Sequence, residues 1–168
     1  MKHPRRYLAL DLGDRRIGLA AGSLEARLAQ PLEVLDRAGD EGDVRVFRRL
    51  RELVKREDIG AIVVGDPVNM DGTAGPRAEM SRDFAGRLQK ALRQVRVELH
   101  DERLSSFSAD EWMDRDGVKP AQRKTRRDAY AAAVILLDYF EHKDEVGRKK
   151  EEGGGRMKDE GGRMKAEG

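Results

Sequence analysis

The hydrophobic pattern of this 168-residue chain has two parts, short strand-like runs at the N-terminus and then helical periods that alternate with strand-like runs, and this division restricts the possible folds more than any other feature. Near the N-terminus the apolar residues form short runs, Tyr7–Leu12, Ile17–Ala21 and Leu32–Leu35, and Gly13-Asp14 separates the first two. Short runs joined by such turn formers predict successive antiparallel strands. Pro31 precedes the third run, where a proline can open an edge strand. We therefore expect an N-terminal antiparallel meander.

Beyond the meander, predicted helices alternate with predicted strands. Apolar residues recur at three- and four-residue intervals over residues 44–54 and 80–92, which predicts two amphipathic helices. Between them, Ile59–Gly65 is a continuous β-branched run, typical of a strand covered on both faces. Val95–Leu99 alternates as a further strand. This order predicts an α/β fold with a five-stranded mixed sheet and helices on both faces.

Two more helices are expected after the last strand. The first runs from Ser106 or Ser108 to about Asp114, because Ser108 and Glu111 have capping-box spacing. The second runs from Asp128 to about His142. It is rich in alanine and apolar on most sides, so we expect it to pack against the sheet.

Length and composition favour one domain, which we place at residues 1–147. Residues 148–168 contain six glycines and repeat Gly-Gly-Arg-Met-Lys, so we expect a disordered tail there. The chain has no cysteine, which excludes disulfides, zinc–thiolate sites and cysteine nucleophiles. No apolar run approaches the roughly 18 residues that span a membrane, and no signal-peptide core is present, so we expect a cytoplasmic protein.

Carboxylates stand at three positions that invite a chemical interpretation. Asp11 ends the first apolar strand, Asp101 and Glu102 follow the last strand, and Asp128 begins the alanine-rich helix. Taken singly, each has an ordinary explanation: a turn residue, a polar loop and a helix N-cap. In the predicted sheet the first and last strands are near-neighbours and the last helix crosses them, so the carboxylates can converge. Convergent carboxylates favour Mg²⁺ or Mn²⁺, and two such ions can support phosphodiester hydrolysis.

Four sequence blocks, in order over about residues 5–142, resemble the YqgF (RuvX) family of Holliday-junction-resolvase-like proteins and pre-16S rRNA nucleases. The blocks are Leu8-Ala-Leu-Asp-Leu-Gly-Asp-Arg-Arg-Ile-Gly-Leu-Ala, Val63-Val-Gly-Asp-Pro-Val-Asn-Met-Asp-Gly-Thr, Asp101-Glu-Arg-Leu-Ser-Ser and Arg127-Asp-Ala-Tyr-Ala-Ala-Ala-Val-Ile-Leu-Leu. The resemblance implies a ribonuclease H-like fold with catalytic Asp11, Glu102 and Asp128. It also implies a metal-dependent endonuclease that processes the 5′ end of pre-16S rRNA, with possible activity on branched DNA.

Two positions depart from the family pattern. Asp66 stands where the family usually has an apolar residue, so it is either an additional metal ligand or a harmless loop change. Ser105-Ser106 replaces the usual threonines and keeps the hydroxyl groups. The expected metal ligands are therefore Asp11, Asp101, Glu102 and Asp128, with Asp66 as a further candidate.

Basic and polar residues near the four blocks are candidates for nucleic-acid contacts. They are Arg15, Arg16, Asn69, Arg103, Lys124 and Arg127. Such side chains can bind phosphates without reading bases, although a surface ion pair or plain solvation is the better explanation of any single one of them. The three histidines, His3, His100 and His142, show no ligand spacing. The few aromatic residues provide little for a base-stacking platform.

Two other functions remain open at this point. An actin-like or sugar-kinase ATPase also opens with a strand and an Asp-x-Gly hairpin, but this chain is too short for paired domains and lacks a second glycine-rich phosphate loop. A non-catalytic nucleic-acid or ribosome-associated module would keep the fold without turnover. Metal-dependent cleavage would distinguish such a module from a nuclease. The expected partners of the nuclease are pre-rRNA and ribosome assembly intermediates, and we expect the protein to be a monomer or a homodimer.

Overall fold

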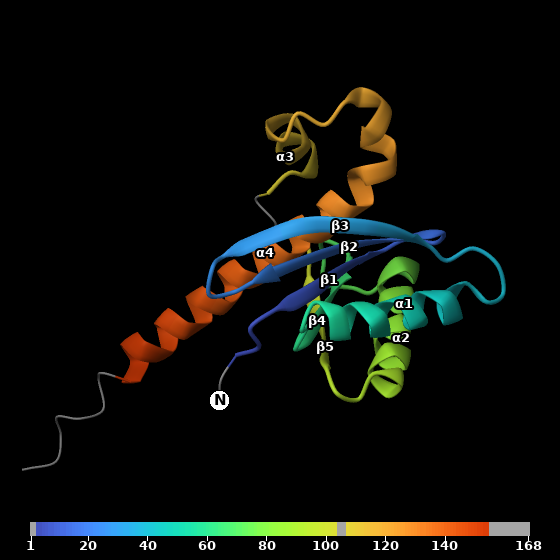
Figure 1. Cartoon of the computed structure of the whole chain (residues 1–168). Coiled ribbons are helices and arrows are strands. Elements are labelled where there is room, and N and C mark those ends of the chain that lie inside the picture. Colours follow the sequence, from blue (N-terminus) through green and yellow to red (C-terminus); the bar gives the residue numbers. More distant parts are fainter. Residues whose placement is uncertain (1–2, 104–106, 155–168) are drawn as a thin grey trace, which may run out of the picture.

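The computed structural model of the chain describes residues 3–103 and 107–154, which form five strands and four helices (Figure 1). In chain order the elements are β1 (Tyr7–Leu12), β2 (Arg16–Ser23), β3 (Leu28–Asp36), α1 (Gly42–Arg56), β4 (Ala61–Asp66), α2 (Pro76–Ala91), β5 (Arg96–Asp101), α3 (Ala109–Arg115) and α4 (Pro120–Gly154). The predicted order of strands and helices is confirmed.

The five strands form one sheet in the order β3-β2-β1-β4-β5. The pairs β1–β2 and β2–β3 are antiparallel, whereas β4 is parallel to both β1 and β5. This arrangement confirms the N-terminal meander and the mixed sheet, and β4 is covered on both faces as its continuous apolar run predicts. It also places the carboxyl ends of β1, β4 and β5 at one edge, where ligands commonly bind in α/β proteins.

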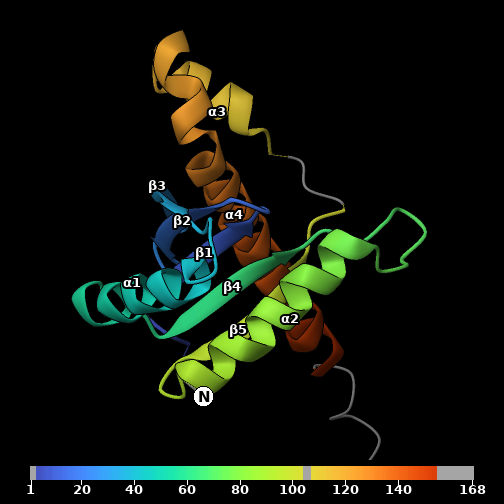
Figure 2. The same cartoon turned by 90° about the vertical axis from the view of Figure 1, so that its right-hand side faces the viewer.

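Helices cover both faces of the sheet, as the sequence predicts (Figure 2). Leu8 and Leu10 of β1 lie in the core beneath α1 and α2, whereas Tyr7 and Ala9 lie in the core beneath α4. Because successive residues of a strand point to opposite faces, this alternation extends to Asp11, which faces α4.

The boundaries of β3 differ from the prediction. The strand begins at Leu28, and Pro31 lies inside it opposite Ala20. The pairing shifts register between Leu19 and Ala20, and β3 is at the edge of the sheet. An edge position next to an irregularity tolerates proline, so Pro31 lies within the strand and the register skips the following residue, Leu32.

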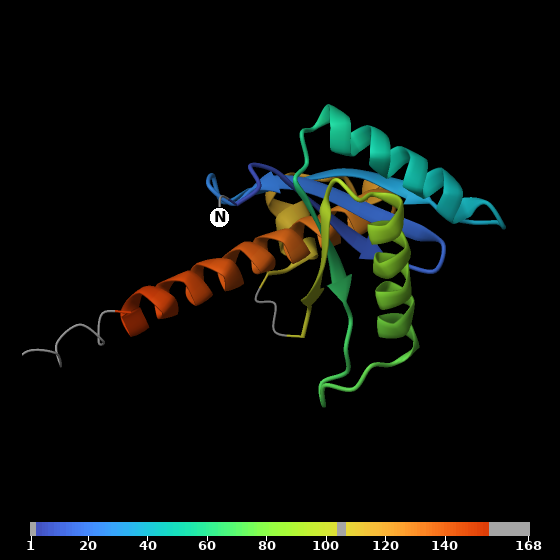
Figure 3. The same cartoon turned by 90° about the horizontal axis from the view of Figure 1, so that it is seen from below.

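The last helix is longer than predicted at both ends. It begins at Pro120, a residue that suits the first helical position because it has no N–H to leave unpaired. Asp128 therefore lies inside α4, and its interpretation as an N-cap is wrong. The helix continues beyond Gly147 to Gly154, so residues 148–154 are helical instead of part of a disordered tail (Figure 3). Residues 155–168 lie outside the described residues, and the domain boundary at 147 stays a prediction.

The short helix α3 begins as the capping-box spacing predicts. Ser108 is its N-cap, and its side chain accepts a hydrogen bond from the backbone N–H of Glu111 at 3.3 Å. The alternative start at Ser106, together with Ser105, lies outside the described residues.

Candidate active site

Asp11 lies between two glycines that keep the α4 face of the sheet open around it. Gly18 of β2 is the partner of Asp11, and Gly65 of β4 follows Val64, the partner of Leu10. A Cβ on Gly18 would lie 1.8 Å from the carbonyl oxygen of Asp128 in α4, and one on Gly65 would lie 1.9 Å from a carboxylate oxygen of Glu102. Both glycines therefore make room for the other two predicted catalytic acids.

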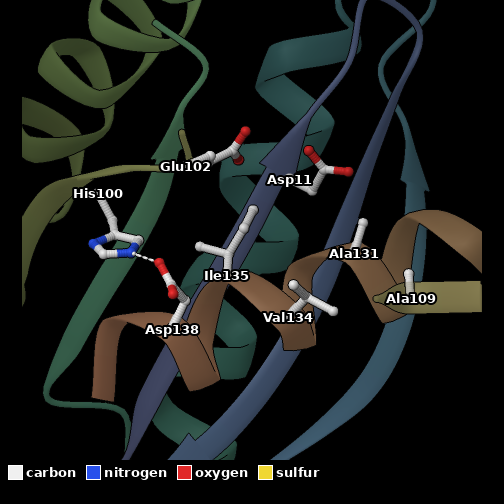
Figure 4. A pocket seen from close by; sticks show the side chains of 8 residues that line it. All are labelled: Asp11, His100, Glu102, Ala109, Ala131, Val134, Ile135 and Asp138. Atoms are coloured by element: carbon white, nitrogen blue, oxygen red, sulfur yellow. Dashed lines mark hydrogen bonds and ion pairs between the residues drawn. The ribbon is translucent and has the colours of Figure 1, made fainter. Parts of the chain in front are cut away.

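Asp11 and Glu102 line one cavity of about 290 Å³ between the sheet and α4. Their carboxylates lie at the same end of it (Figure 4). The remaining lining comes from His100 and Asp138 and from four apolar side chains, Ala109, Ala131, Val134 and Ile135. Apolar walls on this scale restrict the hydration of the two carboxylates.

Asp128 approaches Asp11 from α4. Both side chains line a second cavity with Gly13, Asp14, Arg15, Arg16 and Arg77. Arg16 forms an ion pair with Asp128, with Nε and Oδ2 3.1 Å apart. The structure thus brings the three predicted catalytic residues to one edge of the sheet, with Asp11 shared between two adjoining cavities.

Partial burial and repulsion between neighbouring carboxylates raise the pKa values of Asp11 and Glu102. Burial, followed by repulsion from Asp128, raises the pKa of Asp11 to about 6. Burial, followed by repulsion from Asp11, raises the pKa of Glu102 to about 7. The positive charge of Arg77 opposes both increases. Because the charged forms are disfavoured, a bound cation would be stabilised strongly here.

Asp101 and Asp66 do not join this cluster. They are register partners at the ends of β5 and β4, and they lie on the face toward α2. Asp66 accepts hydrogen bonds from Arg82 of α2, at 3.0 and 3.2 Å, and its Oδ1 is buried without a partner. Asp101 accepts hydrogen bonds from Arg103, which lower its pKa. The geometry therefore favours ion-pair roles for both residues over the predicted metal ligation.

The donor set of the acid cluster fits a hard cation. Asp11, Glu102 and Asp128 supply only carboxylate oxygens, the ligand type that Mg²⁺ and Mn²⁺ prefer. The carboxylate oxygens of these three acids do not all lie within 4.8 Å of one another. Among the described residues, one other group of potential metal ligands does meet that distance. That group is formed by His100, Asp138 and His142, and it includes two histidines that lie 42 positions apart in the sequence. The four-residue spacing of Asp138 and His142 on one helix was the available signal.

The sequence analysis also missed Arg77. This exposed residue lies in the first turn of α2, where Pro76 starts the helix, and its charge reaches both Asp11 and Glu102. Within the described part of the chain its guanidinium has no ion-pair partner. The Gly75-Pro76 helix start was the only local signal, and it says nothing about proximity to Asp11.

The candidate nucleic-acid residues divide into two groups. Arg15 and Arg16 line the cavity beside Asp11 and Asp128, and Lys124 is exposed on α4 upstream of Asp128. The others are engaged elsewhere, since Arg103 pairs with Asp101 and Arg127 with Asp110 at 3.1 Å. Asn69 donates a hydrogen bond to Thr73 within its own loop, at 3.0 Å.

The sheet order defines a ribonuclease H-like fold. The solved structure of T. thermophilus RuvC in complex with a Holliday junction substrate superposes with a TM-score of 0.55 and 19% sequence identity, covering 82% of this chain and 94% of that one. At this identity the likeness concerns the fold.

Sequence comparison gives the family. The chain belongs to the RuvX family, described as Holliday junction resolvase, whose model matches residues 5–142. It is 40% identical over 134 residues to a protein of Chloroflexus aurantiacus and 43% identical over 137 residues to one of Anaeromyxobacter sp. (strain Fw109-5). These matches cover 80% and 81% of this chain and 85% and 96% of the relatives, both named "Putative pre-16S rRNA nuclease".

The described helices include none that is long and apolar enough to cross a membrane.

Proposed function

We propose that this chain is a metal-dependent endonuclease that hydrolyses phosphodiester bonds at the cluster of Asp11, Glu102 and Asp128. The observation that carries the proposal is the convergence of Asp11, Glu102 and Asp128 at one edge of a ribonuclease H-like sheet, and the raised pKa values of Asp11 and Glu102 support it. Burying several acids together costs stability, and a purely structural role would not require it.

Asp11, Glu102 and Asp128 are the residues that would hold Mg²⁺ or Mn²⁺. When bound, such ions supply Lewis-acid activation of water and stabilisation of the leaving oxygen. Asp11 and Glu102 must lose their protons to become ligands, so binding is favoured above their raised pKa values. Arg16 holds the Asp128 carboxylate by its ion pair and thereby orients the third acid.

A nucleic-acid strand would reach this cluster across the basic side of the second cavity. Arg15, Arg16 and Arg77 surround Asp11 there, and Lys124 extends the positive charge along α4. These side chains can position a phosphodiester without reading sequence. The apolar wall of the first cavity would exclude water from the opposite side of the acids.

The preferred substrate in this proposal is the 5′ leader of pre-16S rRNA in cytoplasmic ribosome assembly intermediates. The names of the relatives motivate this choice. A four-way DNA junction is the second candidate, motivated by the family description and the RuvC likeness in fold. A non-catalytic module that only binds nucleic acid is the alternative to both.

Cleavage of both substrates by the same preparation tests the proposal. A labelled pre-16S 5′ leader and a labelled four-way junction would be incubated with Mn²⁺, Mg²⁺ or chelator, using wild type and Asp11→Asn. We expect metal-dependent cutting by the wild type and none by Asp11→Asn, with the RNA cut faster. Binding without cutting in every metal would establish the non-catalytic module instead, and cutting by Asp11→Asn would refute the site.

A further inference from the structure

We infer that His100, Asp138 and His142 form a second cation site, suited to Zn²⁺ and similar transition-metal ions, at the opposite end of the first cavity from Asp11 and Glu102. His100 comes from β5, and the other two residues come from α4. One ligand atom from each lies within 4.8 Å of the other two. The inference concerns different residues from the proposed nuclease site and does not depend on nuclease activity.

The core of this site is a buried histidine–aspartate pair. His100 Nε2 and Asp138 Oδ2 are 2.6 Å apart, and the exposed fractions of the two residues are 8% and 3%. Tyr139 packs edge-on against the His100 ring at 5.7 Å between centroids and limits its rotation. The fold thus holds the two side chains next to each other before any ion arrives, and an ion that bound both would replace the proton that they share.

His142 supplies the third ligand from one helical turn beyond Asp138. Residues four apart on a helix share a face, and this spacing lets two ligands of one helix reach the same ion. The His142 ring lies 5.4 Å from the His100 ring, between centroids. A simple ion pair of His100 with Asp138 would not require a second imidazole at this place.

The distances between the three ligand atoms are close to those of an occupied zinc site but do not match them fully. Ligand atoms around tetrahedral Zn²⁺ at about 2.0–2.1 Å from the ion are about 3.3 Å apart. The atoms here lie within 4.8 Å, so His142 would have to move closer by a side-chain rotation, and the His100–Asp138 pair would have to open from 2.6 Å. His142 is exposed and can make that rotation, and its exposure leaves a fourth position for water.

The chemistry of the two ends of the cavity differs. Figure 4 shows the Asp11 and Glu102 carboxylates at one end, the His100–Asp138 pair at the other, and Ile135 between them. Oxygen ligands alone suit Mg²⁺ and Mn²⁺, whereas two imidazoles with one carboxylate suit Zn²⁺, Co²⁺ and Ni²⁺. We therefore expect different metal preferences at the two ends.

Cobalt provides a spectroscopic test that does not use activity. Untagged full-length protein would be titrated with Co²⁺ in the Asp11→Asn background, which weakens binding at the acid cluster. We expect one Co²⁺ per chain with the intense visible absorption of a four-coordinate ion, displaced by one equivalent of Zn²⁺. His142→Gln should weaken binding by at least about tenfold and remove the intense absorption.

His3→Gln is the matched control, because His3 is also exposed but lies in the N-terminal segment, outside the cluster. It should bind Co²⁺ like its parent. Circular dichroism and melting in metal-free buffer should be the same for His142→Gln, His3→Gln and the parent, since both changes are on the surface. Equal Co²⁺ affinity and spectrum in His142→Gln would overturn the inference, and so would failure of the parent to bind Co²⁺.

Discussion

The two faces of the sheet are built from different kinds of residue. Toward α1 and α2 the strands present leucine, isoleucine and valine, and they bury these against helix residues such as Leu50 and Phe84. Toward α4 they present small residues and tyrosine, and this face also carries Asp11, His100 and Glu102. The first face supplies most of the large apolar burial, and the second concentrates the ionisable groups. The residues that stabilise the fold and the residues proposed for catalysis thus lie on opposite faces of the sheet.

The sharpest test of this separation uses two adjacent carboxylates. Glu102→Gln changes the α4 face and should reduce cleavage about 1,000-fold, equivalent to about 4 kcal/mol of transition-state stabilisation. Asp101→Asn changes the α2 face, where Arg103 is the partner, and should stay within about threefold of wild type. Single-turnover cleavage rates with Mn²⁺ measure both. A large loss in Asp101→Asn would show that both carboxylates contribute to the site.

Substituting a large apolar residue on the α1 and α2 face should instead lower stability and leave the cleavage rate unchanged. Leu50 is fully buried, and Leu50→Ala should lower the free energy of unfolding by about 3 kcal/mol through lost burial and a cavity. Urea denaturation measures the loss. The cleavage rate per folded molecule should be unchanged well below the unfolding transition. A reduced cleavage rate in Leu50→Ala without a loss of unfolding free energy would show that the α1 and α2 face also contributes to catalysis.

A third prediction concerns the pH dependence of stability. The pKa of Asp11 is raised from 3.8 to about 6 in the folded protein, so the folded state binds its proton more tightly than the unfolded chain does. Stability is therefore lost as the pH rises from about 4 to about 7, and Asp11→Asn removes this loss. In chelator, the mutant should be more stable than wild type by about 2 kcal/mol at about pH 8 and by little at about pH 4.

Urea titrations at the two pH values check this prediction. Because Asp11 is also a cause of the raised pKa of Glu102, its removal lets Glu102 ionise at lower pH, which adds to the gain. An equal gain at both pH values would mean that the introduced amide side chain improves packing and that charge repulsion contributes little.

The smallest expected effect belongs to Arg77. Arg77→Ala removes a positive charge that faces Asp11 and Glu102, so substrate binding should weaken about tenfold, and the salt dependence of binding should become shallower. Arg48→Ala is a matched control, because Arg48 is an exposed arginine of α1, away from both cavities. Filter binding with the pre-16S leader over a range of salt measures both variants. Similar weakening in both would indicate general electrostatics instead of a local contact.

Hydrophobic periodicity was sufficient to predict the strands, their order and the two covered faces, because burial repeats every two or every three to four residues along the chain. It also allowed Asp11 to converge with Asp101 or Glu102, whereas the choice of Glu102 came from the family resemblance. The start of α4 was missed because residues 120–127 are polar, so no apolar pattern extends the helix back to Pro120. The separation of Asp101 from Glu102 could have been read from strand alternation, which assigns adjacent residues to opposite faces. Arg77 and the His100–Asp138 contact depend on tertiary packing, which local sequence does not encode.

The origin of the three acids has a consequence for biosynthesis. Asp11 comes from the first strand, Glu102 follows the last strand, and Asp128 lies in the last helix, so no early fragment of the chain contains the whole cluster. A protein that emerges from the ribosome N-terminus first can fold its meander well before α4 is made. At the proposed site, cleavage competence would then arise only when nearly the entire domain has been translated.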